Sequence, residues 1–337
     1  MKHSSPNTAV LSVENLTVNY RGFLALDAVS ADIHAGDIIG IIGPNGAGKT
    51  TFIKALCGRA PISSGEISVN GRRLKRRQNR QSLIGLVPQD IGLYTHLTAR
   101  ENLLAFAKIM GMKGGRTRKI AAVNALHAVE MQAHAETLIS EMSGGMKRRI
   151  NVAAAVMHGP PILILDEPTA GTDHPARDTV HRLARTIADS GKAVLLITHE
   201  LEQAEALCDK VLVLARGQKL AFDHPTSLLS RVYEDKREVM VRFSAPPQGA
   251  AADALGPFKF QPAELPTIWT TMTTASEVSF VSAFMASIRG RQGLVREISV
   301  RRPGLPHLMH DIEKTGRLPT PIPDAAAAQT HKEAGHA

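Results

Sequence analysis

The chain has 337 residues, a length that favours about two domains. Hydrophobic residues make up 43% of it, so a full core is available. Lys and Arg outnumber Asp and Glu by 40 to 31, and the net charge of +9 suits nucleic acid, an anionic membrane surface or solubility alone.

Cysteine usage and hydropathy narrow the class of protein further. Cys57 and Cys208 are the only cysteines and lie far apart, which argues against a disulfide scaffold and a cysteine-based zinc site. The N-terminus lacks the apolar core of a signal peptide, and no stretch approaches the roughly 18 uninterrupted apolar residues of a membrane span. We therefore expect a protein of a reducing cytoplasm that is soluble by itself.

The first predicted strands precede residue 36. Two short strands are expected at residues 9–13 and 16–20, followed by an Arg21-Gly22 turn and a further strand near residues 28–33. Tyr20 ends the second strand. Its ring is either half-buried packing or an aromatic face on which a base could stack, and both alternatives remain open from these residues.

Residues 43–51 are predicted to bind phosphate. They follow an apolar strand at 37–42, their glycines let backbone N–H groups converge on an anion, and a helix begins at Lys49. In the pattern G-x-x-x-x-G-K-T, Lys49 reaches the β- and γ-phosphates and the Thr50 hydroxyl holds Mg²⁺. A glycine turn that binds nothing is the alternative, and the strand before it and the helix after it argue against that. The candidate nucleotide-binding residues here are Gly43, Pro44, Asn45, Gly46, Ala47, Gly48, Lys49, Thr50 and Thr51.

A dense basic run at residues 72–80 follows an Asn70-Gly71 turn. It could contact anionic lipid headgroups or nucleic acid, or form a solvated hairpin or helix face, and it decides no function. Further along, the strand 84–88 delivers Gln89 at its end. Thr98 and Glu101 then have the spacing of a capping box, which predicts a helix start within a helical subdomain at 101–158.

A second small-residue turn, Ser143-Gly144-Gly145, leads into a helix that is expected to reach about residue 158. A hydroxyl and backbone amides at a helix N-terminus could hold another phosphate. The alternative is that this tripeptide only begins a helix and binds nothing, and by itself it does not distinguish the two.

Three polar side chains follow two predicted core strands. The aliphatic strand 162–165 carries Asp166 and Glu167 to its C-terminal end, where ligands bind in open parallel α/β sheets. Asp166 could hold Mg²⁺ through water and Glu167 could polarise an attacking water, whereas the alternative is that both acids merely end a strand. His199 directly follows the strand 193–198, where it could contact a γ-phosphate.

In this order the motifs resemble those of the nucleotide-binding subunit of an ABC transporter, over roughly residues 9–228. Residues 43–50 match Walker A, Gln89 the Q-loop, 142–146 the signature, 162–167 Walker B, His199 the switch histidine and Tyr20 the adenine-stacking position.

The resemblance implies an α/β fold: a P-loop NTPase with an ABC ATPase core, an antiparallel β subdomain, a helical subdomain and a small C-terminal α+β extension. It also implies ATP and Mg²⁺ as ligands, with Thr50, Gln89 and Asp166 at the metal. Glu167 would be the general base, assisted by Lys49 and His199, and Gln89 would also sense the membrane partner.

The resemblance further implies partners. Two cassettes meet head to tail, so ATP would lie between Walker A of one and Ser143, Gly144 and Gly145 of a second copy or a paralogous cassette. A separate transmembrane permease would hold the subunit peripherally at the cytoplasmic face of the inner (plasma) membrane, an indirect association.

Two motifs depart from the family pattern. Met142 and Met146 flank the Ser-Gly-Gly where Leu and Gln are common, and the D-loop reads Gly171-Thr172-Asp173. The phosphate-facing residues are intact, so we expect activity to survive. The D-loop change concerns communication between the two sites.

The chain changes character beyond about residue 228. A strand at 238–243 and an amphipathic helix at 278–289 predict a small accessory domain at 231–303, after the ATPase domain at 8–228. Residues 304–337 are expected to form a C-terminal helix and, after about 317, a disordered tail. Segments 298–305 and 94–103 are similar to the drug- and polysaccharide-exporter type of ABC ATPase, which implies export.

Two other functions compete with this hypothesis. A non-transport ABC ATPase acting on nucleic acid or ribosomes is encouraged only by the charge of +9, and neither a second cassette nor an inserted coiled coil is present. A P-loop kinase or switch GTPase is disfavoured by the signature and by His199. No nucleic acid is expected as a partner.

Overall fold

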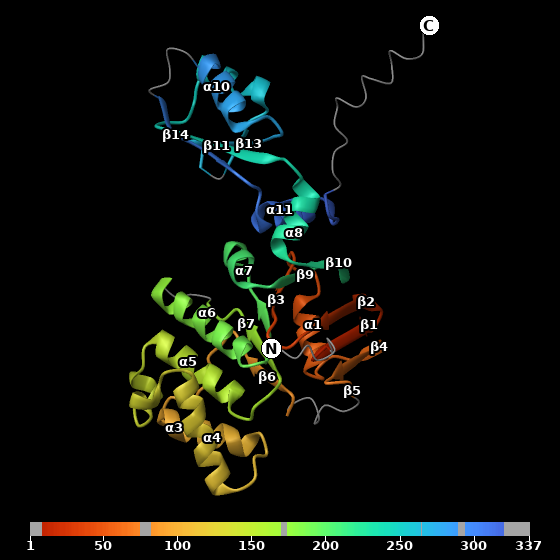
Figure 1. Cartoon of the computed structure of the whole chain (residues 1–337), viewed down its shortest axis with the longest axis vertical. Coiled ribbons are helices and arrows are strands. Elements are labelled where there is room, and N and C mark those ends of the chain that lie inside the picture. The colour runs from red at the N-terminus through yellow and green to blue at the C-terminus, as the bar shows by residue number, and fades with distance from the viewer. Residues whose placement is uncertain (1–8, 75–81, 170–173, 264, 289–293, 320–337) are drawn as a thin grey trace, which may run out of the picture. The chain divides into compact units, whose positions relative to one another are not determined.

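The computed structural model describes residues 9–74, 82–169, 174–263, 265–288 and 294–319. They divide into two compact units, one reaching Pro225 and including Ile312–Arg317, the other formed by Thr226–Asp311 and the residues beyond Arg317 (Figure 1). Each unit has its own hydrophobic core. The basic run from residue 75, the D-loop at 171–173 and the predicted disordered tail from 320 lie outside the described residues.

The first unit contains an antiparallel sheet with the order β2-β1-β4-β5. Its strands are β1 (Leu11–Tyr20), β2 (Phe23–Ile33), β4 (Ile62–Val69) and β5 (Arg72–Arg73). The turn between β1 and β2 has positive φ at Arg21 (49°) and Gly22 (98°), as in a type I′ hairpin. Strand β2 therefore starts at Phe23, earlier than predicted.

The prediction of two separate strands at 9–13 and 16–20 is wrong, because β1 is one strand with a bulge. The pairing with β2 shifts register between Val13 and Leu16, and Asn15 takes a φ of 47°. Gly65 of β4 makes room for the bulge, since a Cβ there would lie 2.3 Å from the Asn15 carbonyl oxygen. The bulge interrupts the hydrophobic alternation that a continuous strand would show.

The second sheet of this unit has the order β10-β9-β3-β8-β7-β6. Five strands are parallel and β10 pairs antiparallel with β9 at one edge. All residues of β3 and β8 are buried, as expected for strands covered on both faces. The strands are β3 (Ile38–Ile42), β6 (Ile84–Val87), β7 (Ile162–Asp166), β8 (Ala193–Ile197), β9 (Lys210–Ala215) and β10 (Gln218–Asp223). Helix α6 (His174–Asp189) connects β7 to β8, and α7 (Leu201–Leu207) connects β8 to β9, whereas α1 (Lys49–Leu56) leads from β3 to β4 of the antiparallel sheet.

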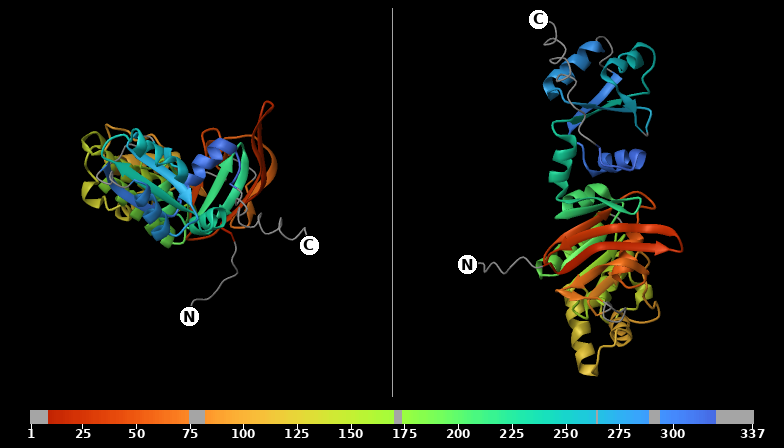
Figure 2. Two further views of the ribbon diagram at one scale, coloured as in Figure 1. Left: turned by 90° about the horizontal axis from the view of Figure 1, so that it is seen from above. Right: turned by 90° about the vertical axis from the view of Figure 1, so that its right-hand side faces the viewer.

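The predicted helical segment is confirmed. It comprises α3 (Ala99–Ile109), α4 (Gly115–Ala128), α5 (Gly144–Val156) and the 3₁₀ turns Gln132–His134 and Ile139–Glu141. The capping box is present: the Glu101 N–H donates to Thr98 Oγ1 (3.2 Å), and the Thr98 N–H donates to Glu101 Oε2 (2.9 Å). Helices α3 and α4 lie at the end of the first unit that is remote from the antiparallel sheet (Figures 1 and 2).

The second unit is built on an antiparallel sheet with the order β12-β13-β11-β14. Val239 and Val241 of β11 pack with Phe280 and Phe284 of α10 in its core. The predicted strand and helix are thus found, whereas β12 and β13 were not predicted. The elements from residue 225 onward are α8 (Pro225–Tyr233), β11 (Arg237–Phe243), α9 (Ala250–Asp253), the 3₁₀ turn Gly256–Phe258, β12 (Gln261–Pro262), β13 (Ile268–Thr273), α10 (Glu277–Ser287), β14 (Val295–Arg301) and α11 (Leu305–Thr315). No helix in the described parts of the chain is long and apolar enough to cross a bilayer.

A buried carboxylate ties three elements of this second unit together. Glu238 of β11 is 5% exposed. It accepts a hydrogen bond from Arg301 Nε, and its Oε1 lies 2.7 Å from His307 Nε2. Burial acts to raise the pKa of Glu238, but the hydrogen bonds from His307 and Arg301 outweigh it and hold the pKa below its ordinary value of 4.5.

This network makes stability depend on pH in a defined direction. Because the folded-state pKa of Glu238 is depressed, its contribution is present above about pH 4.5 and is lost as the pH falls through the folded pKa. Glu238→Gln should therefore lower the free energy of unfolding by about 1–3 kcal/mol near neutral pH, and by less in acid. Urea denaturation of the wild type and the variant, near neutral pH and in acid, measures these two differences in the free energy of unfolding.

Glu297→Gln is the matched control, because Glu297 pairs with Arg242 at 3.7 Å and both side chains are about half exposed. It should change the free energy of unfolding by less than about 0.5 kcal/mol. Equal effects of the two substitutions would contradict the role given to the Glu238 network.

Candidate nucleotide-binding site

The loop between β3 and α1 depends on its glycines in two different ways. A Cβ at Gly43 would lie 2.2 Å from the Leu214 carbonyl oxygen, and one at Gly48 would lie 2.7 Å from Leu26 Cδ2. These two glycines allow close packing against the rest of the unit. A Cβ added at Gly46 would have no atom within 4 Å, but the φ of this residue is 77°. Glycine is therefore needed here for its backbone conformation and not for close packing.

Lys49 points back into this loop from the first turn of α1. Its side chain is 8% exposed, and its Nζ donates to the carbonyl oxygens of Gly43 (2.5 Å) and Pro44 (3.0 Å). Burial lowers the pKa of Lys49, while the charge of Glu167 acts in the opposite direction. The ammonium group is thereby fixed at the centre of the loop.

A turn far along the chain supports the loop from outside. The Gly217 N–H, between β9 and β10, donates to the Ala47 carbonyl (3.1 Å), and the Gly217 carbonyl accepts from the Asp27 N–H (2.8 Å). The loop conformation therefore rests on contacts with both sheets of the first unit.

The parallel sheet gathers most of the predicted site residues at one edge. Residues 43–51 follow β3, Gln89 follows β6, Asp166 ends β7, and His199 follows β8. Because these strands are parallel, their C-terminal ends lie on the same side of the sheet. Each of these residues follows one of the parallel strands, so the order of strands and motifs in the sequence is enough to predict that they lie at this edge.

Glu167 is held in an unusual backbone conformation at this edge. Its φ is 47°, and its N–H donates to the Ile197 carbonyl of the neighbouring strand (3.0 Å). The His199 N–H donates to Glu167 Oε2 (3.4 Å), and His199 Nε2 lies 3.3 Å from Oε1. Among the described residues, Oε1 accepts no hydrogen bond although it is buried.

Burial raises the pKa values of both carboxyl groups at the end of β7. For Glu167, the nearby His199 partly offsets the effect of burial, and Asp166 adds to it. For Asp166, burial is the cause. Within the described residues, no hydrogen bond or ion pair reaches the Asp166 carboxylate.

The remaining predicted residues come from other elements. Tyr20, at the end of β1, is 37% exposed, which favours the available aromatic face over packing. Ser143 caps α5 by accepting a hydrogen bond from the Met146 N–H (3.3 Å), and both Ser143 and Gly144 are exposed. The Ser-Gly-Gly turn thus caps the start of α5, and it also leaves the N-terminus of that helix exposed.

Two buried polar side chains of α5 that lie near the site were not predicted. Arg148 is buried and donates to backbone carbonyls near the site, and Asn151 is 6% exposed with its Nδ2 unpartnered among the described residues. Arg148 stands in the run Lys147-Arg148-Arg149, where nothing in the sequence distinguishes the buried arginine from its neighbours.

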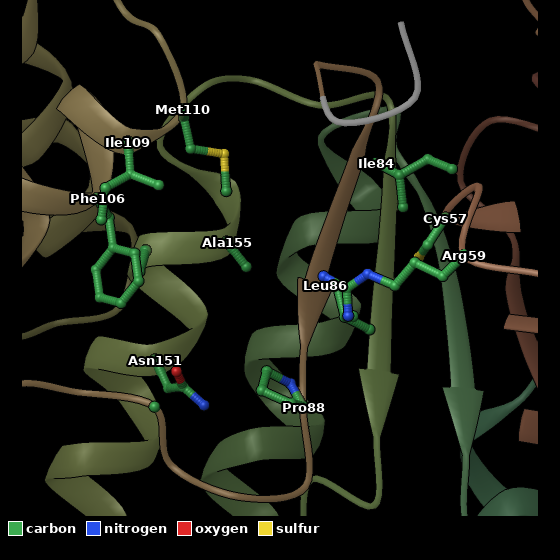
Figure 3. A pocket seen from close by; sticks show the side chains of 12 residues that line it. Cys57, Arg59, Ile84, Leu86, Pro88, Phe106, Ile109, Met110, Asn151 and Ala155 are labelled. Atoms are coloured by element: carbon green, nitrogen blue, oxygen red, sulfur yellow. The ribbon is translucent and has the colours of Figure 1, made fainter. Parts of the chain in front are cut away.

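Asn151 lines a cavity of about 340 Å³ between the parallel sheet and the helical segment. Figure 3 shows Phe106, Ile109 and Met110 on one side and Leu86 and Pro88 opposite, with the Asn151 side chain facing Pro88. The walls are mostly apolar, and Ile109 is 67% exposed at the rim. Such a cavity suits an apolar segment of another molecule that carries a hydrogen-bond acceptor.

A glycine loop between a buried parallel strand and a helix, with two carboxylates at the end of a nearby strand, defines a P-loop nucleotide-binding protein. Comparison with known proteins agrees with this assignment to the P-loop nucleotide-binding proteins. The ABC transporter family profile matches residues 26–170. The linearmycin resistance ATP-binding protein LnrL of Bacillus subtilis is 38% identical over 227 residues, or 67% of this chain and 73% of that protein.

Other relatives give the same result. The Nod factor export ATP-binding protein I of Neorhizobium galegae is 38% identical over 231 residues, or 68% of this chain and 66% of that protein. Among solved structures, cbiO1 of Clostridium perfringens, part of the ABC transporter complex cbiONQ, is 26% identical with a TM-score of 0.61, covering 66% of this chain and 91% of that one. A dimeric ATP-binding cassette in a post-hydrolysis state with ADP and Pi is 25% identical with a TM-score of 0.55, covering 64% and 98%.

This chain belongs to the ABC transporter family and is an ATP-binding subunit of that family, an ATPase. The predicted fold class, an α/β P-loop ATPase core with antiparallel and helical parts and a C-terminal α+β extension, is confirmed.

The packing of Gly43 gives a test of the loop. Gly43→Ala should destabilise the protein by roughly 3 kcal/mol or more and abolish nucleotide binding, because its Cβ would collide with the Leu214 carbonyl. Gly191→Ala is the control, since Gly191 also has positive φ (87°) but nothing within 4 Å. It should cost only about 1–2 kcal/mol of strain and leave binding unchanged. Thermal denaturation and fluorescent-nucleotide titration measure both, and similar losses in the two variants would refute the packing argument.

Proposed function

We propose that this ATPase powers the export of a substrate through a separate transmembrane permease. The observation that carries the proposal is the placement of Glu167 at the same sheet edge as the Lys49 loop, with its buried Oε1 3.3 Å from His199 Nε2 and accepting no hydrogen bond from the described residues. The relatives that are 38% identical have names that refer to Nod factor export and linearmycin resistance, which supports export as the direction.

The residues at the sheet edge divide the chemistry between them. Lys49 and the amides of residues 43–51 bind the β- and γ-phosphates, and Tyr20 stacks on the adenine. Glu167 acts as general base, and its raised pKa makes it a better proton acceptor than an exposed carboxylate. His199 orients Glu167 and contacts the γ-phosphate.

The oxygen donors at the site fit Mg²⁺. Asp166 supplies a carboxylate that makes no hydrogen bond or ion pair with the described residues, Thr50 a hydroxyl and Gln89 a side-chain carbonyl. This hard, all-oxygen set is the kind that Mg²⁺ prefers. When bound, the ion supplies charge neutralisation at the β- and γ-phosphates.

The site is half of a pair. The exposed N-terminus of α5, with Ser143, Gly144 and Gly145, offers a hydroxyl and amides to a phosphate on another molecule. We infer that a second copy or a paralogous cassette completes each ATP site. The dimeric relative with ADP and Pi supports this arrangement.

Glu167→Gln tests the catalytic assignment. The variant should bind ATP with wild-type affinity, hydrolyse it at least about a hundredfold more slowly, and accumulate as an ATP-bound dimer in size-exclusion chromatography, because the base is lost while the phosphate contacts remain. Glu202→Gln, on the exposed first turn of α7, is the control and should behave as wild type. Full turnover by Glu167→Gln would show that another group is the base.

The domains are assigned by the same proposal. Residues 8–228 form the ATPase domain, with the helical subdomain at about 101–158, residues 231–303 an accessory domain, and 304–337 a C-terminal helix and tail. The change of compact unit between Pro225 and Thr226 and the separate cores support the boundary near residue 228.

The permease is proposed to dock in the apolar cavity beside Pro88. A helical segment with apolar side chains and one acceptor for Asn151 Nδ2 matches the walls of this cavity. The residue next to Pro88 is Gln89, so the docked segment would lie beside the metal site. The ATPase is then attached peripherally to the cytoplasmic face of the inner (plasma) membrane.

A charge at the rim of this cavity tests the docking. Ile109→Glu should abolish copurification of a polytopic membrane protein from solubilised membranes, because a carboxylate cannot be buried there without a partner. Nucleotide affinity of the isolated protein should not change. Ile120→Glu is the control, since Ile120 is 52% exposed on α4 and does not line the cavity. Equal copurification with both variants would rule out this surface, and copurified RNA or DNA that resists high salt would refute the transporter assignment.

A further inference from the structure

One buried arginine joins three segments around the proposed catalytic base. Arg148 on α5 is 3% exposed. Its Nη1 donates to the Pro88 carbonyl (2.9 Å), and its Nη2 donates to the carbonyls of Gln89 (2.9 Å) and Glu167 (3.4 Å). A single guanidinium group therefore bonds the backbone at the ends of both β6 and β7.

This arginine is buried at an energetic cost that carbonyl bonds must offset. Burial lowers the pKa of Arg148 and Asp90 partly opposes this, but no carboxylate pairs with the guanidinium among the described residues. The charge is stabilised instead by carbonyl oxygens, through charge-assisted hydrogen bonds. Only a planar group with several donors in a fixed fork can reach the three acceptors, and a lysine ammonium cannot reproduce that geometry.

The Glu167 backbone is restrained on both sides by this arrangement. Its N–H is bonded to Ile197, its carbonyl to Arg148, and its φ of 47° is one that non-glycine residues rarely adopt. Fixing both peptide groups fixes the direction of the Cα–Cβ bond. The position of the carboxylate thus depends on the guanidinium although Arg148 does not touch it.

Arg148 also belongs to the helix that begins at the signature turn. It lies five residues after Ser143, or about 7.5 Å along the helix axis. One turn further on, Asn151 lines the cavity together with Pro88. A displacement of the α5 N-terminus along its axis would move the guanidinium relative to the carbonyls of Gln89 and Glu167.

We propose that Arg148 is a positioning residue for ATP hydrolysis, which aligns Glu167 and the Gln89 segment with the signature helix. The Glu167 carboxylate is in its catalytic position only while α5 lies where Arg148 can bond the carbonyls of Gln89 and Glu167. This inference rests on the proposed roles of Glu167 and Ser143.

The test uses the full chain and compares Arg148→Lys, Glu167→Gln, the double variant and Arg149→Lys. Arg148→Lys keeps the charge but loses the fork, so kcat should fall about ten- to hundredfold while the KM for ATP stays within about twofold. The melting temperature should fall by no more than several degrees, because the lysine still buries a charge that fewer carbonyl bonds offset. Arg149→Lys, whose side chain bonds none of these carbonyls, should retain wild-type kcat.

The double variant separates positioning from packing. If Arg148 acts through Glu167, adding Arg148→Lys to Glu167→Gln should lower kcat no further, and the ATP-bound dimer should still form. Losses that multiply, a failure to fold, a parallel loss of nucleotide affinity, or normal kcat in Arg148→Lys would each overturn the inference. A Glu167→Gln variant with full turnover would instead contradict the proposed function itself.

Discussion

Parallel pairing of β3, β6, β7 and β8 is the constraint on which the site depends. A single strand brings only one or two residues to the site, but parallel pairing places all four C-terminal ends at one edge of the sheet. A polar residue or a glycine loop follows each strand at that edge. The strands can carry this arrangement because they are almost wholly apolar and buried, so their register is strongly specified. The chemistry is then a matter of which residue follows each strand.

This explains why so much of the site could be predicted from the sequence. Asp166, Glu167 and His199 were located because an apolar run with a defined end is visible in the sequence, and the helix starts at Lys49 and Ala99 because glycine and capping patterns are local. The failures lie where structure depends on distant partners. The bulge at Asn15 depends on Gly65 in another strand. Arg148 looked like its basic neighbours, because only the folded chain shows which one is buried.

The two units of the chain use buried charge differently. Glu238 of the second unit accepts hydrogen bonds from Arg301 and His307, which hold its pKa below the ordinary value and stabilise the local fold. Glu167 of the first unit accepts a hydrogen bond only from the His199 N–H among the described residues, and burial raises its pKa, which suits proton transfer better than stability. The same type of side chain is structural in one unit and proposed as catalytic in the other, and the balance between burial and the hydrogen bonds that each carboxylate accepts makes the difference.

The strand order has a consequence for how the chain is made. Strand β3, which leads into the phosphate loop, hydrogen-bonds on its two sides to β8, which starts at Ala193, and to β9, which starts at Lys210, so both partners are encoded far later than Ile38. Gly217, which braces Ala47, comes later still. On a ribosome, the apolar β3 therefore emerges long before either neighbour exists, with both edges open. The loop can therefore acquire its final form only when synthesis of the first unit is nearly complete.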